Sequence, residues 1–453
     1  MVEYSCKNYA QNIAYKYKKD YTAKNVEYIE KTYEQVGKDI KAFGTGLLNL
    51  DLMGERIVVV GKNRYEWCIS YLATTCSNMV IVPIDKALPD IEMQRLIERS
   101  EAKAIIFDEK YLETIKKVQE KENSNLKTLI CMDNIQEKGI KTFNEILEEG
   151  RNQIKNGDQK YDNIEIDENK MSIMLFTSGT TNEPKAVMLS QANICANISN
   201  IACWVKLYPT DVLLSFLPIH HTFECTITFL YGFYSGSQVA FCDGLKHIQQ
   251  NLKEYKVSVF VAVPLVLETM YKKIQKAIEE QGKTGLIKKM TKISNTLLKA
   301  KIDIRKIVFK QILDNFGGHL RVVLYGAAPM NKATIIGYNN LGISLVQGYG
   351  LTETSPVVTA ETDKEKRPGS IGLALANLNL KIANPDNEGV GEITVKGPSV
   401  MLGYYKNPEE TKKVLKDGWF STGDYGYKDK DGFVYITGRK KDIIVPVSYT
   451  HLR

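Results

Sequence analysis

Short apolar runs rich in β-branched residues alternate with longer amphipathic stretches along most of the chain. This alternation predicts strand–helix–strand units on a mainly parallel sheet. Helices are expected at 65–77 and 89–100. The expected strands are 57–60, 81–84, 104–107, 128–132, 172–177, 213–217, 238–241, 257–263, 322–325 and 343–347. We therefore expect a large α/β protein.

The pattern changes after Pro356. Turn-forming pairs such as Asp417-Gly418 and Asp431-Gly432 separate short alternating strands, for example at 392–395 and 433–436. Closely spaced turns of this chemistry are typical of antiparallel hairpins. A small antiparallel β region is therefore expected from about 356 to 437.

Charge is nearly balanced, with 60 Lys and Arg against 53 Asp and Glu in 453 residues. A formal charge of +7 is too small at this length to indicate a nucleic-acid partner, and we expect none. One segment, 272–310, holds twelve basic and three acidic residues. It suits peripheral contact with an anionic membrane surface. A solvated, lysine-rich helix pair is the alternative.

The eight cysteines contain no C-x-x-C pair and lie mostly in apolar runs. That usage indicates free thiols in a reducing compartment. Residues 1–12 lack the pattern of a secretory signal, and no apolar stretch reaches the roughly 18 residues of a membrane span. We expect a cytoplasmic protein without a transmembrane anchor.

A hydroxyl-rich segment follows the expected strand 172–177. It contains Thr177, Ser178, Gly179, Thr180, Thr181 and, after a proline, Lys185. Backbone N–H and hydroxyl groups in such a loop can converge on phosphate oxygens, with the lysine as a point charge. The segment is not a Walker A loop, because the second glycine is missing. A Ser/Thr-rich surface turn is the alternative interpretation.

A second segment, 347–356, follows the expected strand 343–347. Gly348 and Gly350 flank Tyr349, and a hydroxyl and a carboxylate follow at Thr352 and Glu353. The aromatic ring suits stacking on a base, and the carboxylate suits Mg²⁺ held together with phosphate oxygens. The alternative is a glycine-rich strand exit with a solvated glutamate.

Two further groups carry weaker signals. His220 and His221 follow the expected strand 213–217, at the strand end where open α/β sheets bind ligands. Asp424 follows a tight turn, and Arg439 lies fifteen residues later. A carboxylate can accept both ribose hydroxyls, and an arginine suits a phosphate. Surface hairpins with solvated charges would give the same pattern.

In this order and at this spacing, the four segments resemble the adenylate-forming (AMP-binding) superfamily of acyl-CoA synthetases, luciferases and peptide-synthetase adenylation domains. The resemblance extends from Ala10 to Val445. It implies the large N-terminal domain of that fold over 1–437. Two stacked α/β sheet subdomains would cover about 1–355, a small β subdomain about 356–437, and a hinge 438–445.

The resemblance also implies a role for each segment. Thr177 to Thr181 and Lys185 would hold the β- and γ-phosphates of ATP. Thr352 and Glu353 would contact the α-phosphate and Mg²⁺, and His221, rather than His220, would lie near the acyl carboxylate. Asp424 and Arg439 would bind the ribose, and Lys441 would be the hinge residue. The adenine would contact Gly326, Ala327, Ala328, Pro329, Gln347, Gly348, Tyr349 and Gly350.

The implied activity is formation of an acyl-adenylate from a carboxylic acid and ATP, followed by transfer to coenzyme A. The segment 264–271 and the basic stretch after it resemble the long-chain acyl-CoA synthetase branch. Thr222 stands where amino-acid-activating domains usually carry an aspartate, which disfavours an amino acid substrate. A fatty acid–CoA ligase is therefore expected. Two alternatives stay open: another acid or acceptor, such as an aryl acid or an acyl carrier protein, and a non-catalytic adenylate-binding protein.

The chain departs from the family pattern in two places. Asn182 and Ala186 replace glycines that are common in the phosphate loop. After Val445 the family continues into a small domain, of roughly a hundred residues, that carries the lysine for adenylation. Residues 446–453 do not resemble it, and we expect a truncated reading frame with a non-native tail. The fragment is then expected to bind ATP but to form acyl-adenylate poorly.

Overall fold

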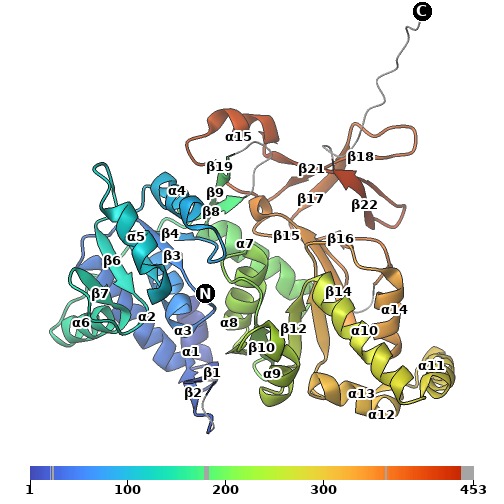
Figure 1. Cartoon of the computed structure of the whole chain (residues 1–453). Helices are drawn as coiled ribbons and strands as arrows, with labels where there is room; N and C mark the ends of the chain where they lie inside the picture. Colours follow the sequence, from blue (N-terminus) through green and yellow to red (C-terminus); the bar gives the residue numbers. More distant parts are fainter. Residues whose placement is uncertain (21, 23–24, 178–182, 363–364, 440–453) are drawn as a thin grey trace, which may run out of the picture.

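The computed structural model describes residues 1–20, 22, 25–177, 183–362 and 365–439. Within this part of the chain the strands form three sheets, of eight, nine and five strands. The expected hinge residue Lys441 and tail 446–453 lie outside the described residues. Figure 1 shows the small sheet above the two larger ones, which lie side by side.

The eight-stranded sheet is parallel except at the end formed by β9 and β19. Its strand order is β19-β9-β8-β4-β3-β5-β6-β7. The bounds are β3 (Arg56–Val60), β4 (Val80–Pro83), β5 (Ala104–Phe107), β6 (Thr128–Cys131), β7 (Ile140–Thr142), β8 (Met171–Thr177), β9 (Lys185–Ser190) and β19 (Gly403–Tyr404). The helices interleaved with these strands are α2 (Tyr33–Leu48), α3 (Tyr65–Cys76), α4 (Asp90–Ser100), α5 (Leu112–Gln119) and α6 (Phe143–Lys155).

The nine-stranded sheet has a parallel centre and antiparallel edges. Its order is β16-β15-β14-β13-β12-β10-β11-β1-β2. The bounds are β1 (Ile13–Lys18), β2 (Tyr28–Thr32), β10 (Val212–Ser215), β11 (Gln238–Phe241), β12 (Val259–Ala262), β13 (Val322–Tyr325), β14 (Ser344–Gly350), β15 (Val357–Ala360) and β16 (Leu373–Ala374). Its helices include α7 (Gln191–Trp204), the wide-turn helix η2 (Glu224–Tyr231), α9 (Ile248–Glu254), α10 (Pro264–Glu280), α11 (Thr284–Lys299) and α14 (Lys332–Asn340).

The small sheet contains β17 (Asn379–Ala383), β18 (Gly391–Lys396), β20 (Leu415–Lys416), β21 (Trp419–Lys428) and β22 (Val434–Arg439), all antiparallel. It begins later than the expected boundary at 356. The strands β15 and β16, which follow that boundary, extend the nine-stranded sheet because they pair with β14. The expected hairpin turns at Asp417-Gly418 and Asp431-Gly432 connect β20 to β21 and β21 to β22.

The predicted α/β class is confirmed, and most expected strands are present within one to three residues. Tyr349 is a correction: it lies within β14, paired with Thr359, and not in a loop after the strand. The antiparallel partner β15 extends β14 through Gly350. The strands β1, β2, β7, β9 and β15 were not predicted.

Helix α7 joins the sheets through buried amide side chains. Its N-cap Ser190 ends β9 and forms a reciprocal capping box with Asn193. Asn197 is fully buried; its Nδ2 donates to the backbone oxygens of Thr354 and Val357, and its Oδ1 accepts from the Val357 N–H. Asn193 Nδ2 donates to the backbone oxygens of residues 398 and 400. One helix therefore fixes the positions of two segments: the one that follows β14 and the one that leads into β19.

Replacing Asn197 by alanine should lower the free energy of unfolding by about 3 kcal/mol, because three buried backbone groups lose their partner. Urea denaturation followed by circular dichroism measures the change. The exposed amide Gln275, on α10, supplies the control Gln275→Ala, for which we expect less than about 0.5 kcal/mol. Equal effects of the two substitutions would contradict the structural role assigned to Asn197.

Candidate functional site

The ends of the hydroxyl-rich segment are held together by β8 and β9. Thr177, the last residue of β8, is paired with Lys185, the first residue of β9, and its Oγ1 donates to the Lys185 carbonyl at 3.4 Å. The segment is therefore the connection of a β-hairpin. Ser178, Gly179, Thr180 and Thr181 lie outside the described residues, so their predicted phosphate contacts stay a prediction.

Lys185 points at a carboxylate that the sequence analysis missed. Its Nζ lies 2.7 Å from Glu410 Oε2 on α15 (Pro408–Val414) and 5.0 Å from the centroid of the Tyr404 ring. The lysine side chain is only 14% exposed. Hydrogen bonds from Lys185 and Lys413 lower the pKa of the Glu410 carboxyl to about 2. The ammonium group is thus held at the start of β9 by an anion and an aromatic face.

Glu353 is held by the same tyrosine. Tyr404 Oη donates to Glu353 Oε1 at 2.9 Å, and the Met401 N–H donates to the Glu353 carbonyl at 2.8 Å. Burial and the Glu353 charge raise the pKa of Tyr404, so its phenol stays protonated and donates. Lys185 and Glu353, which were predicted from segments about 170 positions apart, therefore both contact the side chain of Tyr404.

The segment that carries Tyr404 and Glu410 has a local structural signal. Asn407 caps α15 by accepting from the Glu410 N–H, and Pro408 occupies the first helical position. β19 pairs with β9, which brings Tyr404 opposite Val187. The Asn-Pro pair predicts a helix start, but no feature of the sequence indicates that this helix contacts Lys185.

Tyr349 and Asp424 are hydrogen-bonded to each other. Tyr349 Oη donates to Asp424 Oδ2 at 2.6 Å, and Arg439 Nε lies 3.3 Å from Asp424 Oδ1. Asp424 is 5% exposed, whereas Arg439 is exposed. Burial, together with the Asp424 charge, raises the pKa of Tyr349. The structure thus brings the predicted base-stacking ring, the predicted ribose-binding carboxylate and the arginine together.

The expected adenine-edge segment adjoins β14. Gly326 follows β13, and a Cβ on it would lie 2.7 Å from the Gly348 carbonyl, so only glycine permits this approach. Ala327 has a left-handed backbone with φ of 69°, and Ala327, Ala328 and Pro329 are exposed. Gln347 is buried and accepts from Tyr325 Oη at 2.9 Å. The two predicted adenine segments are therefore neighbours at one end of the sheet.

The two histidines lie close together, with ring centroids 4.1 Å apart. Burial, and then the neighbouring His221, lower the pKa of His220 to about 3. His220 is therefore neutral at physiological pH, and its 3.7 Å approach to Asp85 is not an ion pair there. Burial also lowers the pKa of His221. Thr352 begins the short helical turn that follows β14 after Leu351, beside Glu353.

A small apolar cavity of about 30 Å³ lies behind this end of the nine-stranded sheet. Its walls come from α7, the η2 region, β13 and β14. The side chains that contribute include Ile201, Trp204, Phe223, Ile227, Val346 and Leu375. The cavity adjoins Gln347 and Gly348, so an apolar group placed there would lie next to the predicted adenine segment.

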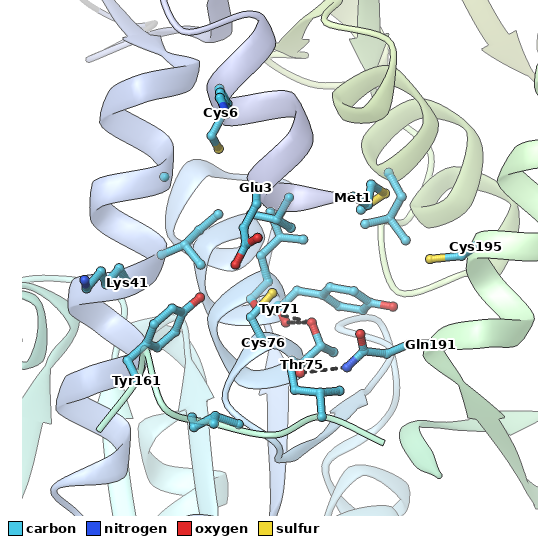
Figure 2. Close-up of a pocket in the computed structure, with 18 of the residues that line it drawn as sticks. Met1, Glu3, Cys6, Lys41, Tyr71, Thr75, Cys76, Tyr161, Gln191 and Cys195 are labelled. Carbon is cyan, nitrogen blue, oxygen red and sulfur yellow. Dashed lines mark hydrogen bonds between the residues drawn. The ribbon is translucent and has the colours of Figure 1, made fainter. Parts of the chain in front are cut away.

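A cavity of about 740 Å³ lies elsewhere, between α1 (Val2–Asn8), α2, α3 and α7. Figure 2 shows Cys6, Cys76, Tyr161, Gln191 and Cys195 around it, and none of the predicted site residues lines it. Burial raises the pKa of the Cys6 and Cys76 thiols to about 11, so both are protonated and poorly nucleophilic at neutral pH.

Comparison with known proteins identifies the family. A model described as "AMP-binding enzyme" matches residues 2–405. The chain therefore belongs to the AMP-binding enzyme family. It is 31% identical over 446 residues to "Long-chain-fatty-acid--CoA ligase 6" of Mus musculus, covering 91% of this chain and 63% of that protein. The chain thus spans less than two thirds of the length of this relative.

Solved structures show the same fold. The inhibitor-bound N-terminal domain of FACL13 from Mycobacterium tuberculosis has a TM-score of 0.75 at 20% identity, covering 97% of this chain and 98% of that one. ATP-bound MatB from Rhodopseudomonas palustris has a TM-score of 0.74 at 22% identity, covering 98% and 80%. The expected adenylate-forming fold is therefore confirmed.

Glu224, which the sequence analysis did not select, is a buried titratable group in this region. It is fully buried, and burial raises the pKa of its carboxyl to about 8. In an unfolded chain a glutamate titrates at about 4.3. The folded protein therefore prefers the protonated carboxyl.

The stabilisation due to this protonated carboxyl is complete below about pH 4 and is lost as the pH rises through 8. Between pH 5 and 8 the free energy of unfolding should fall in the unmodified protein relative to Glu224→Gln, by at most about 1.4 kcal/mol per pH unit. Denaturant titrations across this range measure both proteins. Parallel pH profiles would contradict the raised pKa.

Proposed function

We propose that this chain binds ATP and a carboxylic acid with a long hydrocarbon chain, and that the whole protein forms the acyl-adenylate and transfers the acyl group to coenzyme A. The observation that carries the proposal is the contact of Lys185 and Glu353 with one side chain, Tyr404, near the Tyr349–Asp424 pair. ATP chemistry requires a cation for the phosphates, a carboxylate for Mg²⁺, an aromatic ring for the base, and an acceptor for the ribose hydroxyls.

In the proposed reaction a carboxylate oxygen attacks the α-phosphate, and pyrophosphate leaves. Lys185 binds the departing phosphates in place of Glu410, and Thr352 contacts the α-phosphate. Tyr349 and Asp424 hold the adenosine. These residues act by positioning the reactants and neutralising charge, not by forming covalent bonds. His221, rather than His220, lies near the acyl carboxylate in this proposal.

Glu353 fits a magnesium site. Its carboxylate supplies the hard oxygen that Mg²⁺ prefers, and phosphate oxygens of the substrate complete such sites. The metal, when bound, neutralises phosphate charge. Tyr404 contributes by holding Glu353 Oε1 in place.

The acyl substrate is proposed to be a fatty acid, and two features support it. Thr222 replaces the aspartate expected for an amino acid substrate. The mouse relative is named as a long-chain fatty acid ligase. On the completed protein, acid-dependent thioester formation with CoA, compared with an acyl carrier protein, separates the proposed acceptor from the alternative.

Asp424→Asn should weaken ATP binding at least tenfold, because the ribose hydroxyls lose a charged acceptor. Isothermal titration calorimetry with ATP and with 2′,3′-dideoxy-ATP tests this. The unmodified chain should prefer ATP, and the variant should lose that preference. The exposed Asp90 gives the matched control Asp90→Asn, which should bind ATP as the unmodified chain does. An unchanged preference in Asp424→Asn would refute the assigned ribose site.

We also infer that the basic segment 272–310 contacts an anionic membrane surface from the cytoplasmic side. Several of its large apolar side chains are exposed: Leu286, Ile293, Leu298, Ile302 and Ile307. Leu286 and Ile293 are seven residues apart on α11, so they share one face, with Lys289 and Lys292 between them. Apolar and basic side chains in this mixture suit an interfacial helix. The helices of the described part are too short or too polar to span a bilayer.

Charge reversal should test this contact. The triple variant Lys288→Glu, Lys289→Glu, Lys292→Glu should bind vesicles containing phosphatidylserine at least tenfold more weakly than the unmodified chain, since each lysine near the surface contributes about 1 kcal/mol. The control carries the same charge change at exposed sites elsewhere: Lys246→Glu, Lys428→Glu and Lys430→Glu. Sedimentation with vesicles measures both, and equal loss in the two variants would contradict the proposed surface.

A further inference from the structure

Glu224 is a fully buried carboxyl at the start of η2, three residues after His221. Its neighbours are polar but uncharged. Thr228 Oγ1 donates to Oε2 at 2.9 Å, and the Ser215 hydroxyl and the Phe216 N–H also lie against the carboxyl and favour its charged form. Oε1 has no hydrogen-bond partner among the described residues. The carboxyl thus connects the end of β10 to the first turn of η2.

A second set of contacts, from the eight-stranded sheet, fixes the loop 216–223 that precedes Glu224. Asn63 follows β3, and its Nδ2 donates to Ser215 Oγ at 2.8 Å and to the Leu217 carbonyl at 2.7 Å. The Ile219 N–H approaches Asn63 Oδ1 at 3.4 Å. The loop 216–223 is therefore held at its start by Asn63 and across its base by Glu224, with Ser215 contacting both.

This loop carries side chains of the proposed site. Phe223 lines the small apolar cavity, and its ring lies 3.7 Å from the point that a Cβ on Gly326 would occupy. His221 occupies the position expected near the acyl carboxylate. A shift of the loop would consequently move Phe223 relative to Gly326 in the predicted adenine segment.

Among the described residues, the titratable groups packed around Glu224 include no cation. They are the thiols of Cys68 on α3, Cys225 on η2 and Cys242 after β11. Burial raises the pKa of all three, so they are neutral at physiological pH. Ionising Glu224 would place an unpaired charge among them, which costs free energy unless the loop moves to admit water.

We propose that Glu224 is a positioning residue: its buried carboxyl, while it is uncharged, leaves in place the loop that carries Phe223 and His221, the residue predicted to lie near the acyl carboxylate. The inference rests on the proposed function. It assigns to Glu224 no contact with substrate. It predicts instead that acyl recognition, and not nucleotide recognition, depends on the protonation of this buried group.

The test uses a hydrolysis-resistant acyl-adenylate analogue, in which a sulfamate joins a fatty acyl group to adenosine, and AMP as the comparison ligand. Calorimetry measures both ligands between pH 7 and 9. If only the protonated form holds the loop, the affinity of the unmodified chain for the analogue should fall about tenfold at pH 9, because about a tenth of the molecules stay competent. AMP affinity should stay constant.

Three variants distinguish positioning from simple packing. Glu224→Gln keeps the shape of the protonated carboxyl. At both pH 7 and pH 9 this variant should therefore bind the analogue with the affinity that the unmodified chain has at pH 7. Glu224→Leu should bind the analogue weakly at every pH while retaining AMP. The exposed control Glu388→Gln should behave as the unmodified chain does.

A pH-independent affinity of the unmodified chain for the analogue, or a Glu224→Gln variant as weak as Glu224→Leu, would overturn the inference while the proposed function stands. Failure of the unmodified chain to bind either ligand would overturn the proposed function and this inference with it.

Discussion

The buried amides of α7 are the constraint on which the site depends. Asn193 and Asn197 satisfy backbone groups from two later segments of the chain, near residues 354–357 and 398–400. Unpaired buried backbone groups are costly, so these segments have little freedom to lie elsewhere. Because α7 starts directly from β9, the same helix fixes both segments relative to Lys185.

Tyr404 holds together two charged groups of the proposed nucleotide site. Its ring faces the Lys185 ammonium and its hydroxyl binds Glu353, so one side chain sets the separation of a cation and a carboxylate. The Tyr349–Asp424 hydrogen bond extends the cluster to the small sheet. The proposed nucleotide site therefore draws on all three sheets, and each contributes only part of the chemistry.

The sequence patterns predicted the helices and strands more accurately than they predicted the contacts between these elements. Strands such as β5, β11 and β13 were predicted at their exact bounds, because they are short, apolar and buried in parallel pairs. β1, which lies between β11 and the edge strand β2, was missed because lysines alternate with its tyrosines. The motif residues Lys185, Tyr349, Glu353 and Asp424 were selected from the chemistry of their local segments, and the family resemblance implied their roles.

The partners Tyr404, Glu410 and Glu224 were not selected. Glu410 meets Lys185 across 225 residues, a separation at which no local spacing carries information. No local pattern in the sequence indicates that Glu224 is buried; the packing of η2 against β10 shows it. Burial and long-range pairing are properties of the fold, so these roles become visible only in three dimensions.

The central claim is the location of the nucleotide site, and photolabelling tests it most directly. The chain would be irradiated with 8-azido-ATP, with and without excess ATP, and the labelled peptides identified by mass spectrometry. The account predicts ATP-protected labelling of peptides that contain Tyr349 or Gly326 to Pro329. Protected labelling confined to peptides around the cavity of Cys76 and Tyr161 would contradict it.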